Sequence, residues 1–170
     1  DLEGSDLGSD SHRQMPKPGY RIPMPKIKKK FTQRDKDLFL RNAFIVIKEY
    51  FQHALTELNH NYSEIETDLL EITNYKFICT IYINGKIAKK CKIWIGGLTS
   101  SDSIAYYTGA FNFDSDNSYS DMLSIEHDDE QLGFKPTYSH LGFSNQNKKD
   151  LLSAEQAAEY LWKEFTVNLQ

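Results

Sequence analysis

Hydrophobic residues recur with a helical period in the first third of the chain. Thr32 is followed three residues later by Asp35, which is the spacing of a helix N-cap and a first-turn acid. The apolar residues that then repeat every three or four positions are Phe44, Ile47, Phe51, Leu55 and Leu58. This pattern predicts a long helix over roughly 33 to 60 with one buried face.

The pattern near the C-terminus indicates a second helix. Ser153 and Gln156 have the spacing of a capping box, in which each side chain binds the backbone N–H of the other residue. The apolar residues that follow at helical spacing are Ala158, Leu161, Trp162 and Phe165. We therefore expect a helix over 154–167.

Between the helices the period changes to two residues, which is typical of half-buried strands. Pro136 indicates an edge position for the last strand, because proline cannot donate a hydrogen bond to a neighbouring strand. The predicted fold class is α+β, with an antiparallel sheet of about five strands packed against a long N-terminal helix and a C-terminal helix. The strands are expected near 65–69, 77–83, 87–95, 103–113 and 132–136, with a short helix or turn at 122–125.

The Asn84-Gly85 turn allows two registers for the hairpin around it. A two-residue loop would pair Ile83 with Lys86 and put the apolar residues of the two strands on opposite faces. A three-residue loop with a glycine bulge pairs Tyr82 with Lys86 and brings both sets to one face, so we predict the bulged loop. The two sets are Phe77, Cys79 and Ile81, and Ile87, Cys91 and Ile93.

The bulged register also places the two cysteines. Cys79 lies beside Lys89 and Cys91 beside Phe77, so the cysteines are diagonal neighbours and we expect free thiols. The residues expected on the solvent face of these strands include Lys90, Lys92 and Trp94.

The composition divides the chain into three parts. Residues 1–14 have almost no apolar side chains and precede Met15, and we expect them to be an artificial leader left by cloning. Residues 15–31 contain four prolines and six basic residues, which predicts an extended basic arm. We expect residues 32–170 to form a single domain, because this length supports one sizeable core.

No segment has the character of a membrane span or an export signal. The apolar runs fall short of the roughly 20 residues that a membrane helix needs. Two cysteines are too few for a disulfide framework and lack zinc-site spacing. We therefore expect a cytoplasmic protein without a membrane partner.

Two acidic segments, FDSDNSYSD at 113–121 and EHDDE at 126–130, are candidates for chemistry. An EF-hand is excluded, because Tyr119 stands where that loop needs glycine and Ile125 stands where it needs glutamate. No other catalytic or nucleotide-binding motif is present, so we expect no catalytic residues and no cofactor.

A looser metal site, or metal-dependent hydrolysis, stays open as a third alternative, although we expect no metal. It would require acidic side chains of both segments to converge, and loops rich in Asp, Asn and Ser are commonly turns that bind their own backbone. The acids concerned are Asp114, Asp116, Glu126 and Asp128.

Nucleic-acid or nucleotide binding is a stronger alternative. Lysines neutralise phosphates, and aromatic rings stack on bases. The residues that would do so lie in the arm and on the predicted solvent face: Lys28, Lys29, Lys30, Lys90, Lys92 and Trp94.

Three segments together resemble a domain of presumed bacterial antiphage defence proteins, which is found beside Toll and interleukin receptor (TIR) domains or alone. They are YKFICTIYINGKIAKKCKIWIGG, NSYSDMLSIEHDDEQLGFKP and LSAEQAAEYLWKEF, and the similarity covers about residues 32–168. The matching positions are Asn117, Ser118, Tyr119, Ser124, Glu126, Asp128 and Trp162.

The resemblance implies a sensing or partner-docking module, since the glutamate-bearing TIR fold is absent from this chain. The leading hypothesis is therefore a non-enzymatic recognition module that binds a protein partner or a TIR-type effector. Its expected interaction loop contains Asn117, Ser118, Tyr119, Glu126, Asp128 and Asp129.

Overall fold

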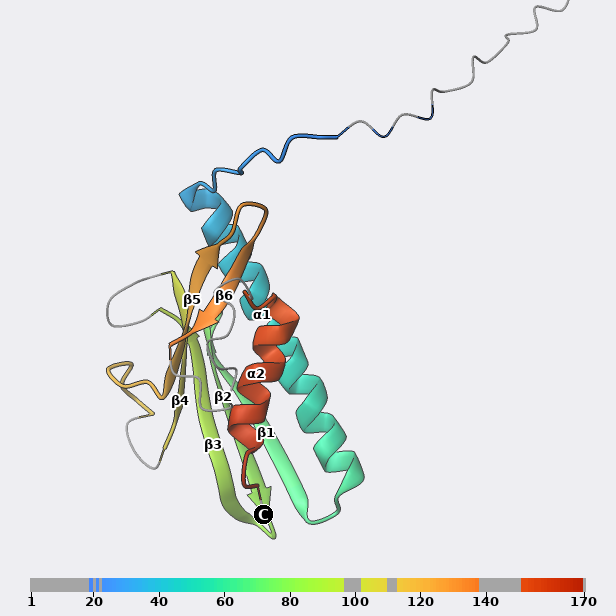
Figure 1. Cartoon of the computed structure of the whole chain (residues 1–170). Helices are drawn as coiled ribbons and strands as arrows, with labels where there is room; N and C mark the ends of the chain where they lie inside the picture. The colour runs from blue at the N-terminus through green and yellow to red at the C-terminus, as the bar shows by residue number, and fades with distance from the viewer. Residues whose placement is uncertain are drawn as a thin grey trace, which may run out of the picture.

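The computed structural model describes residues 19, 21, 23–96, 102–109, 113–137 and 151–169. The helices in these residues are α1 (Gln33–Asn61) and α2 (Ala154–Thr166). The strands are β1 (Ile65–Thr73), β2 (Lys76–Ile83), β3 (Lys86–Ile95), β4 (Ser103–Thr108), β5 (Asp121–His127) and β6 (Leu132–Pro136). They form one antiparallel sheet in the order of the sequence, and both helices lie on the same face of it (Figure 1). The predicted α+β fold class is confirmed.

Both helices begin at the predicted caps. Thr32 Oγ1 accepts a hydrogen bond from the Asp35 N–H at 3.2 Å, and Asp35 Oδ2 accepts one from the Thr32 N–H at 2.8 Å. These bonds lower the pKa of Asp35. Ser153 and Gln156 make the same reciprocal pair at the start of α2. Each cap thus satisfies backbone donors that the first turn leaves unpaired.

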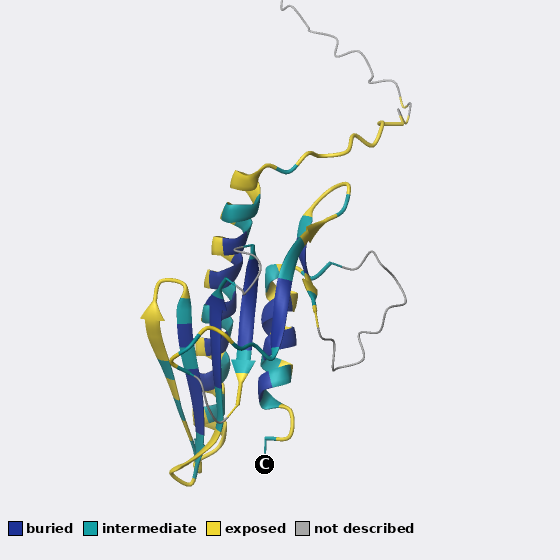
Figure 2. Cartoon of the chain, turned by 90° about the vertical axis from the view of Figure 1, so that its left-hand side faces the viewer, coloured by how far each residue is buried: buried dark blue, intermediate teal, exposed yellow. Residues whose placement is uncertain are grey.

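The core is an apolar layer between the two helices and the sheet, seen as the dark blue region of Figure 2. The ring of Phe77 in β2 lies 5.5 Å from that of Phe44 and 5.9 Å from that of Phe51, both in α1. Phe51 also contacts Trp162 and Phe165 of α2. The apolar faces predicted for the helices and the central strands therefore meet in one cluster.

The turn between β2 and β3 differs from the prediction. Ile83 pairs directly with Lys86, so the loop has two residues and the predicted pairing of Tyr82 with Lys86 is wrong. Asn84 and Gly85 both have positive φ angles, of 51° and 77°. This turn is favoured because its twist matches that of the strands it joins.

A bulge inside β3 brings the apolar residues to a common face instead. Ala88 has no partner in β2, because its neighbours Ile87 and Lys89 pair with the consecutive residues Tyr82 and Ile81. Beyond the bulge the apolar residues of β3 face the helices, as predicted. Ile87 precedes the bulge and is 61% exposed, so its predicted place in the core is wrong.

The bulge also changes the relation between the cysteines. Cys79 pairs directly with Cys91, and Phe77 pairs with Ile93, so the predicted diagonal arrangement is wrong. Both cysteines are buried and free, as expected.

Within the described residues the sheet has six strands, one more than the five expected. Residues 121–127 form β5 and not a helix or turn. Met122 and Leu123 are both buried although they point to opposite faces, so this strand lacks the alternation that reveals half-buried strands. The edge position indicated by Pro136 is confirmed, because β6 ends the sheet.

Several sequence predictions fall on residues outside the described ones. They include the leader at 1–14, residues 15–18, 20 and 22 of the arm, and residues 110–112 of the strand expected over 103–113, which is observed as β4. Among the described residues, no helix combines the length and the apolar character needed to cross a membrane.

Candidate functional site

The loop that leads into β5 carries the predicted residues Asn117, Ser118 and Tyr119, and its described part is 113–120. It lies against the sheet face that bears no helix (Figure 1). We call it the Lys92-anchored loop, for the following reason.

Lys92 of β3 holds this loop. Its Nζ donates hydrogen bonds to the backbone oxygens of Phe113 (3.1 Å) and Ser115 (2.6 Å) and to Oδ1 of Asp116 (3.1 Å). An ammonium group has three donors, and these acceptors match their number. The side chain is 0% exposed, and a buried charge is tolerated only when it is paired and hydrogen-bonded. The lysine therefore depends on the loop as much as the loop depends on the lysine.

Asp116 connects the loop to two strands. Its Oδ2 accepts a hydrogen bond from Lys76 of β2, while its Oδ1 faces Lys92 of β3. Burial by itself would raise the pKa of Asp116, but the hydrogen bonds and charges of the two lysines outweigh burial and lower the pKa below its usual range. The carboxylate is thus charged at neutral pH and bridges two cations.

Aromatic contacts fix the start of the loop. The ammonium group of Lys90 lies 4.5 Å from the ring centroid of Phe113, and the ring of Tyr107 lies 5.3 Å from that of Phe113. The Lys92 ammonium lies 4.6 Å above the ring of Trp94. Cations over ring faces add to the attraction between the loop and the strands.

The predicted recognition residues lie on this framework. Asn117 is exposed, whereas Ser118 and Tyr119 are half-buried. The loop is tied to β4 before it enters β5, since the Ser120 N–H donates to the backbone oxygen of Tyr106 at 2.7 Å. The loop thus presents a short polar tip whose two ends are held by the sheet.

The prediction that Lys92 and Trp94 are exposed to solvent is wrong. Lys92 is 0% exposed, because the Lys92-anchored loop covers it, and Trp94 is 3% exposed. Alternation along β3 correctly assigns both to the face away from the helices, but it carries no information on what else packs there. Lys90 keeps part of its side chain in solvent.

The other predicted interaction residues belong to a separate surface. Glu126, Asp128 and Asp129 lie at the far end of β5 from the Lys92-anchored loop. β5 has seven residues and a length of about 20 Å at ~3.3 Å per residue. The single interaction loop expected from the sequence is therefore divided into two surfaces.

The basic arm contacts the second surface. The backbone N–H of Lys29 donates to the backbone oxygen of Asp129 at 3.1 Å. Lys28 Nζ lies 3.8 Å from a carboxylate oxygen of Asp129. The Phe31 ring centroid lies 5.6 Å from that of His127. The end of the arm nearest α1 and the β5–β6 turn thus contact each other.

Asp128 has a structural role in that turn. Its Oδ1 accepts hydrogen bonds from the backbone N–H groups of Glu130 (2.7 Å) and Gln131 (2.8 Å), and these bonds lower its pKa. A side chain that closes its own turn in this way is less available to a partner. Of the three predicted acids on this surface, Glu126 and Asp129 are exposed.

The structure does not assemble the alternative metal site. Asp116 faces two lysines, and Glu126 lies at the other end of β5. Within the described parts of the chain, no group of three or more His, Cys, Asp or Glu side chains could hold a metal ion.

A buried polar contact that the sequence pattern did not predict lies on the helix side of the sheet. Asp121 is 1% exposed, and its carboxylate accepts hydrogen bonds from the Tyr160 hydroxyl at 2.5 Å and from the Met122 N–H at 2.7 Å. Burial and the adjacent Asp121 raise the pKa of Tyr160. The contact ties α2 to β5. The only sequence signal for this contact was an acidic residue directly before the apolar pair at 122–123.

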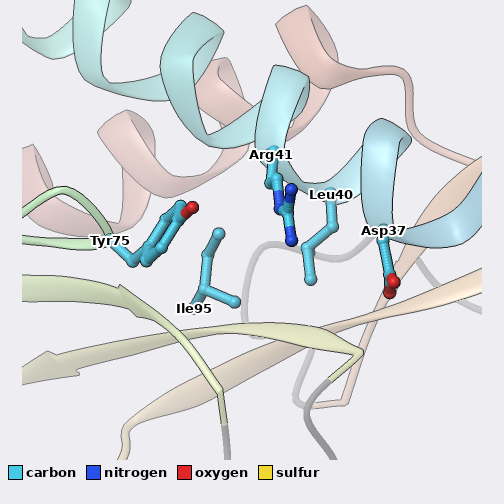
Figure 3. Close-up of a pocket in the computed structure, with 5 residues that line it drawn as sticks. All are labelled: Asp37, Leu40, Arg41, Tyr75 and Ile95. Atoms are coloured by element: carbon cyan, nitrogen blue, oxygen red, sulfur yellow. The ribbon is translucent and has the colours of Figure 1, made fainter. Parts of the chain in front are cut away.

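A small pocket lies between α1 and the sheet. It is lined by Asp37, Leu40, Arg41, Tyr75 and Ile95, and Figure 3 shows Arg41 extending from α1 toward the strands. Its volume of about 190 Å³ is below the roughly 300–1,000 Å³ of small-molecule sites. We assign no ligand to it.

Residues 66–167 match a family model described as the Y4lF protein domain. A relative among curated proteins, "Uncharacterized protein y4lF" of Sinorhizobium fredii, is 33% identical over 152 residues. The match covers 89% of this chain and 46% of the relative, so the chain spans about half the length of that protein. No solved structure matches the chain. The family match runs from β1 to the end of α2 and therefore includes the Lys92-anchored loop.

Proposed function

This chain belongs to the Y4lF domain family, and we propose that it is a non-enzymatic recognition module that binds a protein partner through the Lys92-anchored loop. The geometry of the loop and its composition support this function.

The burial of Lys92 is the observation that carries the proposal. Removing a charge from water costs several kcal/mol, and here the compensating acceptors are two loop carbonyls and one loop carboxylate. A simple connection between two strands needs no such anchor. A loop held in one conformation loses less entropy when a partner binds, which favours recognition.

The residues at the loop tip fit such a role. Asn117 and Ser118 offer short polar groups, and Tyr119 offers a ring with a hydroxyl group. Tyrosine and small polar residues are enriched in protein recognition loops, because they combine contact area with adaptable hydrogen bonding.

The nucleic-acid alternative loses its central residues. Lys92 and Trp94 are covered, so the arm lysines and Lys90 are what remain for phosphate contacts. We therefore favour a protein partner. The sequence resemblance to domains found beside TIR domains supports a TIR-type effector, acting in antiphage defence, as the first partner to test.

The test is affinity capture from the native host with quantitative mass spectrometry. Wild-type protein is compared with Tyr119→Ala, which changes the tip, and with Lys92→Met, which removes the anchor. Glu57→Ala is the matched control, because Glu57 is exposed on α1, far from the loop along the chain.

A specific partner should be captured by the wild type and the Glu57→Ala control and lost with the two loop variants. Reconstitution with that purified partner should then reproduce the difference. Capture of the same proteins by all four forms would show that the loop is not the binding surface.

A further inference from the structure

We propose that the free edge of β1 is a second binding site, at which an extended basic segment of a partner protein adds as a further strand. The inference rests on the proposed recognition function and specifies the chemistry of the partner.

The two edges of the sheet differ in what covers them. Beyond β6, Phe134 and Leu152 exchange backbone hydrogen bonds of 2.8 and 2.9 Å, so the chain itself occupies that edge. Beyond β1, no described segment pairs with the strand, and residues 66–73 have backbone partners in β2 alone. Figure 2 shows β1 as an outermost, largely exposed strand.

The β1 edge carries few of the usual protections against pairing, and its register shift lies only at its C-terminal end, between Glu71 and Thr73. Natural edge strands commonly carry lysine or proline, or are very short. β1 has nine residues, IETDLLEIT, and contains neither lysine nor proline. Its backbone groups are thus open to strand addition, in which main-chain hydrogen bonds supply affinity and alternate side chains supply specificity.

The edge is also preformed. On its helix side, Thr67 Oγ1 donates to the Leu55 oxygen of α1 at 3.3 Å, and Glu71 forms an ion pair with Lys48 of α1. These contacts hold the strand in place before any partner arrives. A partner therefore has only its own chain to order, which lowers the entropic cost of binding.

The outward face of β1 specifies a basic and apolar partner. Glu66, Asp68 and Leu70 alternate on this face, and all three are exposed. In the described part of the chain neither acid has an ion-pair partner. Leu70 pairs with Ile78 of β2, which extends the apolar area. A complementary strand carries two basic residues at alternate positions and an apolar residue two positions further on.

Charge argues against a second copy of this chain as the occupant. β1 contains three acidic residues and no basic one. Pairing two β1 strands would bring six carboxylates to one junction, and like charges across neighbouring strands are destabilising. A basic strand instead gains charge pairs at the same positions.

The probe is a fluorescein-labelled peptide rich in threonine, with lysines at two alternate positions and valine two positions further on. A matched peptide carries glutamates in place of the lysines. Anisotropy is measured with the wild type, with the double variant Glu66→Lys/Asp68→Lys, and with Glu49→Lys/Glu57→Lys, two exposed positions on α1, as a charge-matched control. Hydrogen exchange is followed over residues 66–72.

The wild type and the control should bind the lysine peptide about tenfold more tightly than the glutamate peptide, and the double variant should reverse this preference. Binding should slow amide exchange in β1. Equal binding of the lysine peptide by wild type and double variant, or unchanged exchange in β1, would overturn the inference. A wild-type dimer dispersed by Leu70→Lys would also overturn it and assign the edge to a second copy.

The two proposals fail separately. If Tyr119→Ala captures the same partners while the peptide still binds β1, the loop surface is wrong and the edge site stands. If capture depends on Tyr119 but the peptide does not bind, the edge site is wrong and the loop surface stands.

Discussion

Lys92 Nζ lies 3.1 Å from Asp116 Oδ1, although 24 positions separate the two residues in the chain. The contact places a fully buried cation beneath a loop whose tip is exposed. Stability of the domain and presentation of the loop are therefore linked through one side chain.

Replacement of Lys92 by methionine should lower the free energy of unfolding by about 2–4 kcal/mol, because two carbonyls and a carboxylate lose their donor. Lys76→Met should cost less than about 1 kcal/mol, since Lys76 keeps 24% of its side chain in solvent. Urea denaturation measures both. Equal losses in the two variants would contradict the view that Lys92 is the anchor.

The contribution of Asp116 should depend on pH. Its folded-state pKa lies below the usual 3.8, so the unfolded chain binds the proton first as the pH falls. The stabilisation is complete above the unfolded-state pKa and is lost as the pH falls through the folded-state pKa. The difference in stability between wild type and Asp116→Asn should therefore shrink on acidification below about pH 4. The stability of both forms is measured from about pH 6 to about pH 2. A difference in stability that stays constant over this range would contradict the prediction.

The two cysteines should be unreactive in the native protein. They face each other across β2 and β3, both are buried, and burial and the neighbouring Cys79 raise the pKa of Cys91. Thiolate is the reactive form, so a thiol reagent should label neither residue until the protein unfolds. Intact mass should show both thiols reduced. Rapid labelling without denaturant would show that this part of the core opens.

The bulge at Ala88 can be tested by truncating one residue on each side of the sheet. Ile87→Ala should change stability by less than about 0.5 kcal/mol, because Ile87 is 61% exposed. Ile81→Ala should cost about 2–5 kcal/mol, because Ile81 is 0% exposed. Thermal unfolding compares the two. Similar losses would place Ile87 in the core, as the three-residue loop had predicted.

Local patterns were sufficient for much of the fold. The capping sequences at Thr32 and Ser153 predicted both helix starts, because a cap is formed by residues three positions apart. The alternation in β2 and β3 predicted the face that meets the helices. It did not predict the bulge at Ala88, since a two-residue turn and a bulge elsewhere produce the same apolar face as a bulged loop.

The candidate site was less predictable. Asn117, Ser118 and Tyr119 were identified as loop residues, but their anchor at Lys92 was assigned to a solvent face. Strand alternation divides residues between two faces and does not state whether a distant segment covers one of them. The same limit hid Asp121, whose partner Tyr160 lies 39 positions away.

By itself, the order of amino acids determined the helices, most of the strands and the division between apolar and polar faces, because these depend on periods and caps within a few residues. Only the tertiary structure decided that Lys92 is buried, that β5 separates the two acidic segments, and that no described segment pairs with the outer edge of β1. These features depend on which distant segments come to lie against each other, and the energy of a buried charge or an unpaired strand edge is set by that packing.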